Sequence, residues 1–149
     1  MLLSCRVQRL EVGMGINHSS RVDVYLHVVW ATWDRAPFLT PEVREQVYLS
    51  IRAECAEMRA EIIALGGIED HVHVLLRLPA TIAIADLVKQ MKGSSSHLTN
   101  HRILPRGFKW QGGYSASSVS PRSVSRVRDY IMRQEEHHRE GTIYPRAEL

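Results

Sequence analysis

Cysteine and long apolar stretches are scarce in this 149-residue sequence, and each scarcity excludes a class of protein. The two cysteines, Cys5 and Cys55, belong to no motif, and such usage fits the reducing cytoplasm best. No stretch approaches the ~18 apolar residues that span a membrane. Arg6, Gln8 and Arg9 interrupt the N-terminal stretch, which therefore lacks the apolar core of a signal peptide. We expect a cytoplasmic protein with no membrane partner.

Lysine is also scarce, with 3 Lys against 16 Arg, but the basic residues are unevenly distributed. Residues 1–88 carry 8 Lys and Arg against 11 Asp and Glu, a net charge of −3. Residues 89–149 carry 11 against 5, a net charge of +6. This asymmetry suits a nucleic-acid contact surface in the second half of the chain. Alternatively, the arginines reflect genome composition and lie on solvated faces.

Hydrophobic residues make up 44% of the sequence and charged residues 23%, both ordinary values for a globular protein. The length suffices for one domain with a substantial core. Residues 1–20 form a polar extension to which we assign no role, and residues 21–149 are expected to form the domain.

The hydrophobic pattern predicts alternating strands and helices. Period-two alternation and turn residues indicate strands over 22–30, 60–68, 71–79 and, interrupted by glycines, 108–120. Helical spacing predicts helices over 41–58, around Ile84–Met91, and from Pro121 to about His138. Without the last helix the order is β-α-β-β-α-β, which is a ferredoxin-like, RRM-like α+β fold. Its antiparallel four-stranded sheet carries two helices on one face, and the C-terminal helix is an addition.

Two histidines, His71 and His73, stand one residue apart in the stretch EDHVHVLLRLP. Alternate side chains of a strand point to the same face, so the two imidazoles project together. Histidine is a common metal ligand, but two ligands do not close a zinc site, and a third must come from elsewhere. The other interpretation is two polar strand residues that hydrogen-bond to their neighbours.

The C-terminal helix offers residues that would complete such a site. Tyr130 and Gln134 are four residues apart and would share a helix face, offset from the apolar stripe of Val124, Val127 and Ile131. The Tyr130 phenolate could attack phosphorus while the carbonyl oxygen of Gln134 joins the histidines around a cation. Taken singly, Tyr130 is equally a packing aromatic and Gln134 a solvated helix residue.

Other side chains are weaker candidates. Asp70 either orients a histidine as an outer acceptor or ends the turn. Glu135, Glu136, His137 and His138 fall around the helix, so we expect them to be exposed. Five basic residues could line a groove that binds a DNA backbone: Lys89, Lys92, Arg102, Arg106 and Lys109.

Together, DHVHVLLRLP, LVKQMKGSSS, FKWQGGYSASSVS and VRDYIMRQEEHHR resemble, in this order, the small single-tyrosine transposases of bacterial insertion sequences. These belong to the HUH superfamily, named for histidine–bulky apolar–histidine, here His71-Val72-His73. The likeness covers roughly residues 22–140 and implies one HUH domain over 21–149. It implies that His71, His73 and Gln134 bind the metal and that Tyr130 is the nucleophile.

The resemblance also implies an activity. Members cleave single-stranded DNA, leaving a 5′-phosphotyrosine and a free 3′-hydroxyl, which later attacks another phosphotyrosine and joins the strands. They use Mg²⁺ or Mn²⁺, recognise hairpins near the element ends, and act as homodimers whose sheets merge edge to edge. One nucleophile per chain cannot hold two cleaved ends, so a dimer is also a mechanistic expectation.

Two rival functions remain open. One is a non-catalytic module that binds single-stranded nucleic acid on the same fold, which would call for stacking aromatics on the central strands instead of HVHVLL. The other is a metal-dependent hydrolase that activates water, with Tyr130 merely structural. Such an enzyme would cleave DNA without becoming attached to it.

Overall fold

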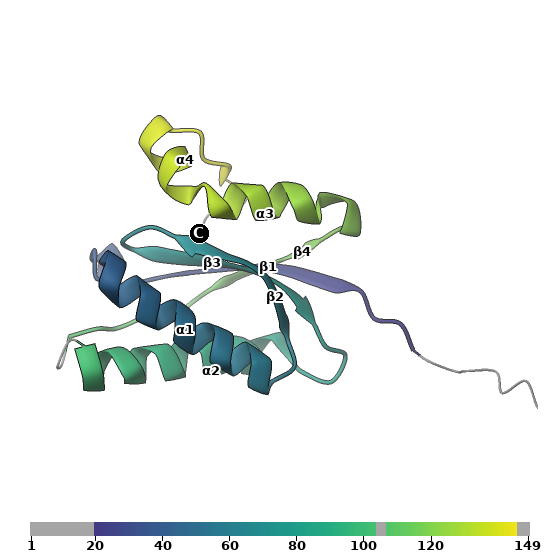
Figure 1. Cartoon of the computed structure of the whole chain (residues 1–149), viewed down its shortest axis with the longest axis horizontal. Helices are drawn as coiled ribbons and strands as arrows, with labels where there is room; N and C mark the ends of the chain where they lie inside the picture. Colours follow the sequence, from purple (N-terminus) through teal and green to yellow (C-terminus); the bar gives the residue numbers. More distant parts are fainter. Residues whose placement is uncertain (1–19, 104–106, 146–149) are drawn as a thin grey trace, which may run out of the picture.

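Four segments of alternating apolar residues form the sheet at the centre of the computed structural model, which describes residues 20–103 and 107–145. The strands are β1 (Val24–Ala31), β2 (Glu61–Gly67), β3 (His71–Leu78) and β4 (Ser115–Val119). They are ordered β2-β3-β1-β4, and every neighbouring pair is antiparallel. This is the predicted ferredoxin-like α+β arrangement (Figure 1). Of the predicted extension over 1–20, all but Ser20 lies outside the described residues.

Helices cover both faces of the sheet. The helices are α1 (Pro41–Glu57), α2 (Ile84–Leu98), α3 (Val124–Met132) and α4 (Gln134–Glu140). Helices α1 and α2 lie together on one face, as predicted, and α3 and α4 lie on the other (Figure 1). None of the helices in the described part of the chain is both long and apolar enough to cross a bilayer.

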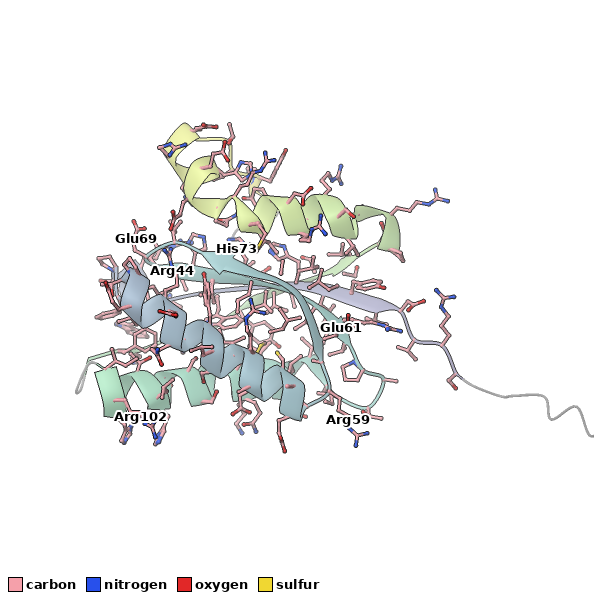
Figure 2. The ribbon with its side chains drawn as sticks, viewed as in Figure 1. Arg44, Arg59, Glu61, Glu69, His73 and Arg102 are labelled. Carbon is pink, nitrogen blue, oxygen red and sulfur yellow. The ribbon has the colours of Figure 1, made fainter. Side chains whose placement is uncertain are left out.

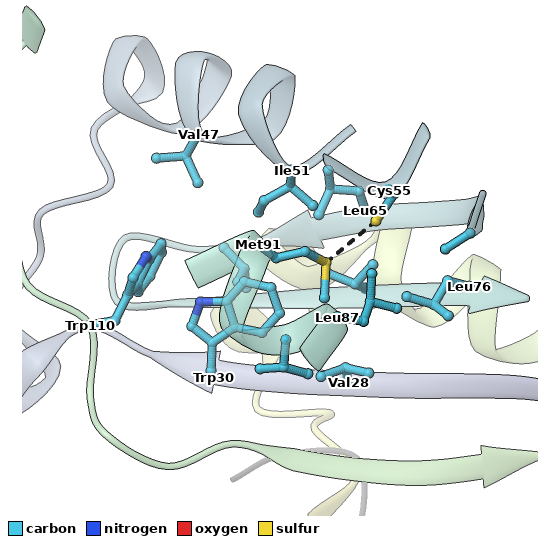
Figure 3. Packing of buried hydrophobic residues seen from close by; sticks show 14 of the residues in the cluster. Val28, Trp30, Val47, Ile51, Cys55, Leu65, Leu76, Leu87, Met91 and Trp110 are labelled. Carbon is cyan, nitrogen blue, oxygen red and sulfur yellow. Dashed lines mark hydrogen bonds between the residues drawn. The ribbon is translucent and has the colours of Figure 1, made fainter. Parts of the chain in front are cut away.

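The two faces of β3 therefore enter two different cores. Val72, Val74 and Leu76 point into the larger core beneath α1 and α2, together with Trp30 and Met91 (Figure 3). The intervening side chains point to the α3 face, where a small core consists of Ala64, Leu75, Tyr130 and Ile131. Period-two alternation thus sends the histidines away from the main core and towards α3.

Helix α1 begins as its sequence predicts. Pro41 occupies the first turn, and the Thr40 hydroxyl accepts a hydrogen bond from the Val43 amide at 3.4 Å. At the other end of α1, the thiol of Cys55 contacts the sulfur of Met91 at 3.4 Å inside the core. Burial raises the pKa of Cys55 to about 11, so this thiol stays protonated and inert at neutral pH.

Two predicted elements have different limits in the structure. The strand predicted over 108–120 is confined to β4, because Gln111, Gly112 and Gly113 form a loop whose carbonyls accept hydrogen bonds from Lys92. The continuous helix predicted from Pro121 to about His138 is wrong. It starts as a 3-10 turn over Pro121–Ser123 and breaks at Arg133, whose φ of −112° and ψ of 25° are not helical. The Arg133 amide bonds the carbonyl of Tyr130, which closes α3.

Candidate active site

His71 and His73 lie side by side on β3, in the layer between the sheet and the C-terminal helices. Their exposed fractions are 1% and 0%, and their ring centroids are 4.9 Å apart. Figure 2 shows His73 at the sheet surface below these helices. The predicted shared face is therefore confirmed, and both imidazoles are withdrawn from bulk solvent.

Each histidine is held through its Nδ1 atom. Asp70 Oδ1 lies 2.6 Å from Nδ1 of His71, while Arg35 pairs with the other carboxylate oxygen at 3.5 Å. On the other histidine, Nε2 of His27 lies 2.9 Å from Nδ1 of His73. An outer partner on one ring nitrogen leaves the other nitrogen to a ligand. The orienting contact considered for Asp70 is present, whereas His27 was not foreseen.

Tyr130 stands in the last turn of α3, with its ring centroid 6.1 Å from that of His73. Only 6% of the residue is exposed, and it packs in the small core. The prediction that the helix face of Tyr130 is offset from the apolar stripe is therefore wrong. Its hydroxyl oxygen accepts a hydrogen bond from the Tyr144 amide at 3.3 Å. Tyr130 also lines a cavity of about 370 Å³ with His27, Ser117 and Arg126. This cavity provides access to the phenol.

Gln134 opens α4, directly after the break that ends α3. It is 2% exposed, and neither atom of its amide has a hydrogen-bond partner within the described residues. It lines a cavity of about 550 Å³ together with Gly66 and Gly67, and Gly66 pairs with His73 across the sheet. A buried amide without a partner is costly in a folded protein, so its retention points to a ligand.

These residues form a donor set that fits a divalent cation. Imidazole nitrogens and an amide oxygen can together bind several divalent metals. In the described ranges, no three His, Cys, Asp or Glu side chains converge as a metal site would require. A metal at this position would therefore depend on the amide of Gln134.

Gly66 determines how closely α3 approaches the sheet. A Cβ atom at this position would overlap the main-chain oxygen of Ile131, the neighbour of Tyr130. We expect Gly66→Ala to lower the free energy of unfolding by about 1–3 kcal/mol, because α3 must move away from β2. Urea denaturation measures the change.

Gly93→Ala is the matched control, since a Cβ atom there meets nothing within 4 Å. This substitution in α2 should raise stability by up to about 1 kcal/mol through helix propensity. Equal stability of the two variants would contradict the close approach of α3 to Gly66.

His138 belongs to this layer although the sequence predicted exposure. Its ring centroid is 5.0 Å from that of His71, and the residue is half-buried. His137 is also half-buried and packs on Tyr130, with 4.7 Å between ring centroids. Glu135 and Glu136 are exposed, as predicted. The break at Arg133 explains the difference, because it reorients α4 relative to a continuous helix.

The predicted DNA-binding residues do not gather at this site. Lys89 and Lys92 lie on α2 and Arg102 follows it, on the opposite side of the sheet from α3 (Figure 2). The Lys92 ammonium donates to three loop carbonyls at 2.6–3.2 Å, and burial lowers its pKa. Lys109 stands 3.7 Å over the Trp33 ring. Arg106 lies outside the described residues, and a DNA-binding role for these side chains stays a prediction.

Other arginines line the cavities beside Tyr130 and Gln134 and were missed by the sequence analysis. Arg126 lines the cavity beside Tyr130, and Arg44, Arg133 and Arg139 line the one beside Gln134. Arg44 also pairs with Glu135 at 2.7 Å and donates to the carbonyl of Gly67 at 3.2 Å, which ties α4 to α1. No local sequence signal distinguishes these arginines from the other arginines of the chain.

Residues 20–134 match the family model described as "Transposase IS200 like". The transposase of insertion sequence element IS200 from Salmonella typhimurium is 26% identical over 121 residues, covering 77% of this chain and 79% of the relative. The ISDra2 transposase TnpA of Deinococcus radiodurans is 29% identical over 114 residues, covering 72% of this chain and 81% of the relative.

Two solved structures are similar in fold. The crystal structure of a candidate transposase from Deinococcus radiodurans R1 aligns with a TM-score of 0.65 at 26% identity, covering 81% of this chain and 98% of that one. A REP-associated tyrosine transposase, solved bound to a REP hairpin, aligns with a TM-score of 0.61 at 15% identity. The alignment covers 95% of this chain and 81% of that one. At 15% identity the second likeness supports the fold alone.

Proposed function

This chain belongs to the IS200-like transposase family, and from that premise we propose that it cleaves and rejoins single-stranded DNA through a covalent bond to Tyr130. The observation that carries the proposal is the position of Tyr130, whose ring lies 6.1 Å from that of His73 beside a cavity of about 370 Å³. Neither a binding module nor a structural tyrosine requires a phenol held beside two buried imidazoles.

A divalent cation, Mg²⁺ or Mn²⁺, would be held by His71, His73 and Gln134. When bound, the cation would polarise the scissile phosphate and offset the charge that develops on it. The chain itself prepares the ligands, because Asp70 and His27 hold the two imidazoles through Nδ1. The partnerless amide of Gln134 supports the same assignment.

In the proposed step, Tyr130 Oη forms a bond to phosphorus while the bond from phosphorus to the 3′ oxygen breaks. The phenol loses its proton and the leaving 3′ oxygen gains one, so the products are a 5′-phosphotyrosine and a 3′-hydroxyl. The Tyr144 amide donates a hydrogen bond to Tyr130 Oη and thereby orients this oxygen. Strand joining is the same exchange in reverse, with an incoming 3′-hydroxyl releasing Tyr130.

We further propose that the protein acts as a homodimer on DNA hairpins at element ends. Each chain supplies one nucleophile, so holding two cleaved ends requires two chains. Strand β4 is at the sheet edge and pairs with β1 alone among the described strands, which leaves an edge open to a second copy. A protein of the same fold has been solved bound to a REP hairpin, so a hairpin is the first form of DNA to test as the partner.

Gln134→Met separates the role of the amide from its packing. Without metal, the variant should be about 1–2 kcal/mol more stable than the wild type, because it removes a buried polar group that lacks a partner. Adding Mn²⁺ should then stabilise the wild type and leave the variant unchanged. Thermal unfolding with and without Mn²⁺ measures both effects, and a less stable metal-free variant would argue against the assignment.

The proposed activity is tested with purified protein, single-stranded DNA carrying the element ends, and Mg²⁺ or Mn²⁺. Denaturing electrophoresis should reveal a covalent protein–DNA adduct that disappears when the metal is chelated. Cleavage without an adduct would indicate that water is the nucleophile. Binding of cognate ends without any reaction would favour the non-catalytic module.

A further inference from the structure

His27 is the one histidine of β1, and it meets His73 across the β1–β3 pair. Nε2 of His27 lies 2.9 Å from Nδ1 of His73, while the ring centroids are 5.1 Å apart and the ring planes differ by 14°. Because the nitrogens are much closer than the centroids, the rings meet through their edges. This is the geometry of an N–H···N hydrogen bond between two imidazoles.

Such a bond needs one proton between the two nitrogens. If Nδ1 of His73 carries it, the lone pair of neutral His73 is on Nε2, the nitrogen that would bind a metal. If Nε2 of His27 carries it, neutral His73 is protonated on Nε2 and that atom cannot bind a metal. The partner of the imidazole therefore decides which tautomer His73 adopts.

Burial keeps His27 as the hydrogen-bond partner of His73 and so maintains one tautomer of His73. His27 is 6% exposed and His73 is fully buried, so neither ring readily exchanges its partner for water. His71 has the equivalent contact from Asp70 at 2.6 Å, and a carboxylate can only accept that hydrogen bond. Both histidines of the pair are therefore contacted at Nδ1, His71 by a carboxylate and His73 by an imidazole.

We propose that His27 is a positioning residue that accepts a hydrogen bond from Nδ1–H of His73 and so presents Nε2 of His73 to the metal. This role rests on the proposed metal site at His71 and His73. It acts through His73 and requires no contact between His27 and DNA. His27 also lines the cavity beside Tyr130, so the same residue contacts both His73 and the cavity that contains the proposed nucleophile.

The tautomer itself is the direct test, and it needs neither metal nor DNA. Long-range ¹H–¹⁵N spectra of the metal-free protein above neutral pH report which ring nitrogens carry protons, and signals absent from His73→Gln identify His73. We expect His73 protonated on Nδ1 and His27 unprotonated on Nε2. A proton on Nε2 of His73, or on both of its nitrogens, would overturn the proposal.

Two variants then test the consequence. His27→Phe keeps an aromatic ring but offers no acceptor, and its affinity for Mn²⁺ in the absence of DNA should fall by about 10–100-fold. His27→Gln carries an amide oxygen that can accept the same bond, and it should recover most of that affinity. Calorimetric titration measures both constants, with His97→Phe on the exposed face of α2 as the matched control.

Equal Mn²⁺ affinities of His27→Phe and wild type would also overturn the proposal, as would a failure of His27→Gln to recover affinity when it folds normally. Neither readout depends on DNA cleavage. A protein with the expected tautomer and affinities that forms no phosphotyrosine would refute the proposed function and leave the role of His27 intact.

Discussion

We expect Tyr130→Phe to eliminate the covalent protein–DNA adduct and to lower strand cleavage by at least about 10³-fold, while the protein still folds and binds single-stranded DNA. The change removes one oxygen and keeps the ring that packs in the small core with Leu75 and Ile131. The hydroxyl accepts a hydrogen bond from the Tyr144 amide, and the net worth of a typical intramolecular hydrogen bond is about 1 kcal/mol, so the variant should still fold. Denaturing electrophoresis of labelled DNA measures adduct and cleavage together.

Tyr144→Phe provides the matched control for this experiment. Tyr144 packs against the Tyr130 ring with 5.0 Å between centroids, is 60% exposed, and contributes its main-chain amide. Its phenol oxygen has no part in the proposed step, so the variant should form adduct at nearly the wild-type level. An adduct that survives in Tyr130→Phe and disappears in Tyr144→Phe would mean that the nucleophile had been assigned to the wrong tyrosine.

His73→Ala should lower cleavage by roughly 10³-fold, which corresponds to about 4 kcal/mol of lost transition-state stabilisation. His73 is fully buried and is bonded to His27, so the variant loses a proposed metal ligand together with its orienting contact. Higher Mn²⁺ concentrations should not restore the rate, because a ligand is missing. DNA binding should be retained, because His73 lies beneath the surface.

His97→Ala is the control for the loss of an imidazole. His97 lies near the end of α2, is exposed, and contacts His101 with 4.0 Å between ring centroids. Its removal should leave both cleavage and its dependence on metal unchanged. A His73→Ala enzyme that cleaves at the wild-type rate, or a wild-type enzyme that is active with a chelator, would refute a metal at the histidine pair.

Much of the fold could be predicted because its signals are local. Alternation along β1 and β3 and the Thr40-Pro41 cap depend on neighbouring residues, and each is reproduced in the structure. The break of the C-terminal helix was missed, because no glycine or proline stands at or next to Arg133 to indicate it. Its cause is tertiary, because the turn lets Ile131 approach Gly66 while Gln134 enters the buried layer.

The sequence by itself determined the order of the four strands and of α1 and α2, the shared face of His71 and His73, and, through the ordered motifs, membership of the transposase family. Only the tertiary structure brought His27 to His73 and His138 to His71, and buried the amide of Gln134. His27 and His73 are 46 residues apart, and their contact depends on the register in which β1 pairs with β3. Which residues of β1 and β3 meet depends on how two segments far apart in the sequence pair, and neither segment taken alone contains that information.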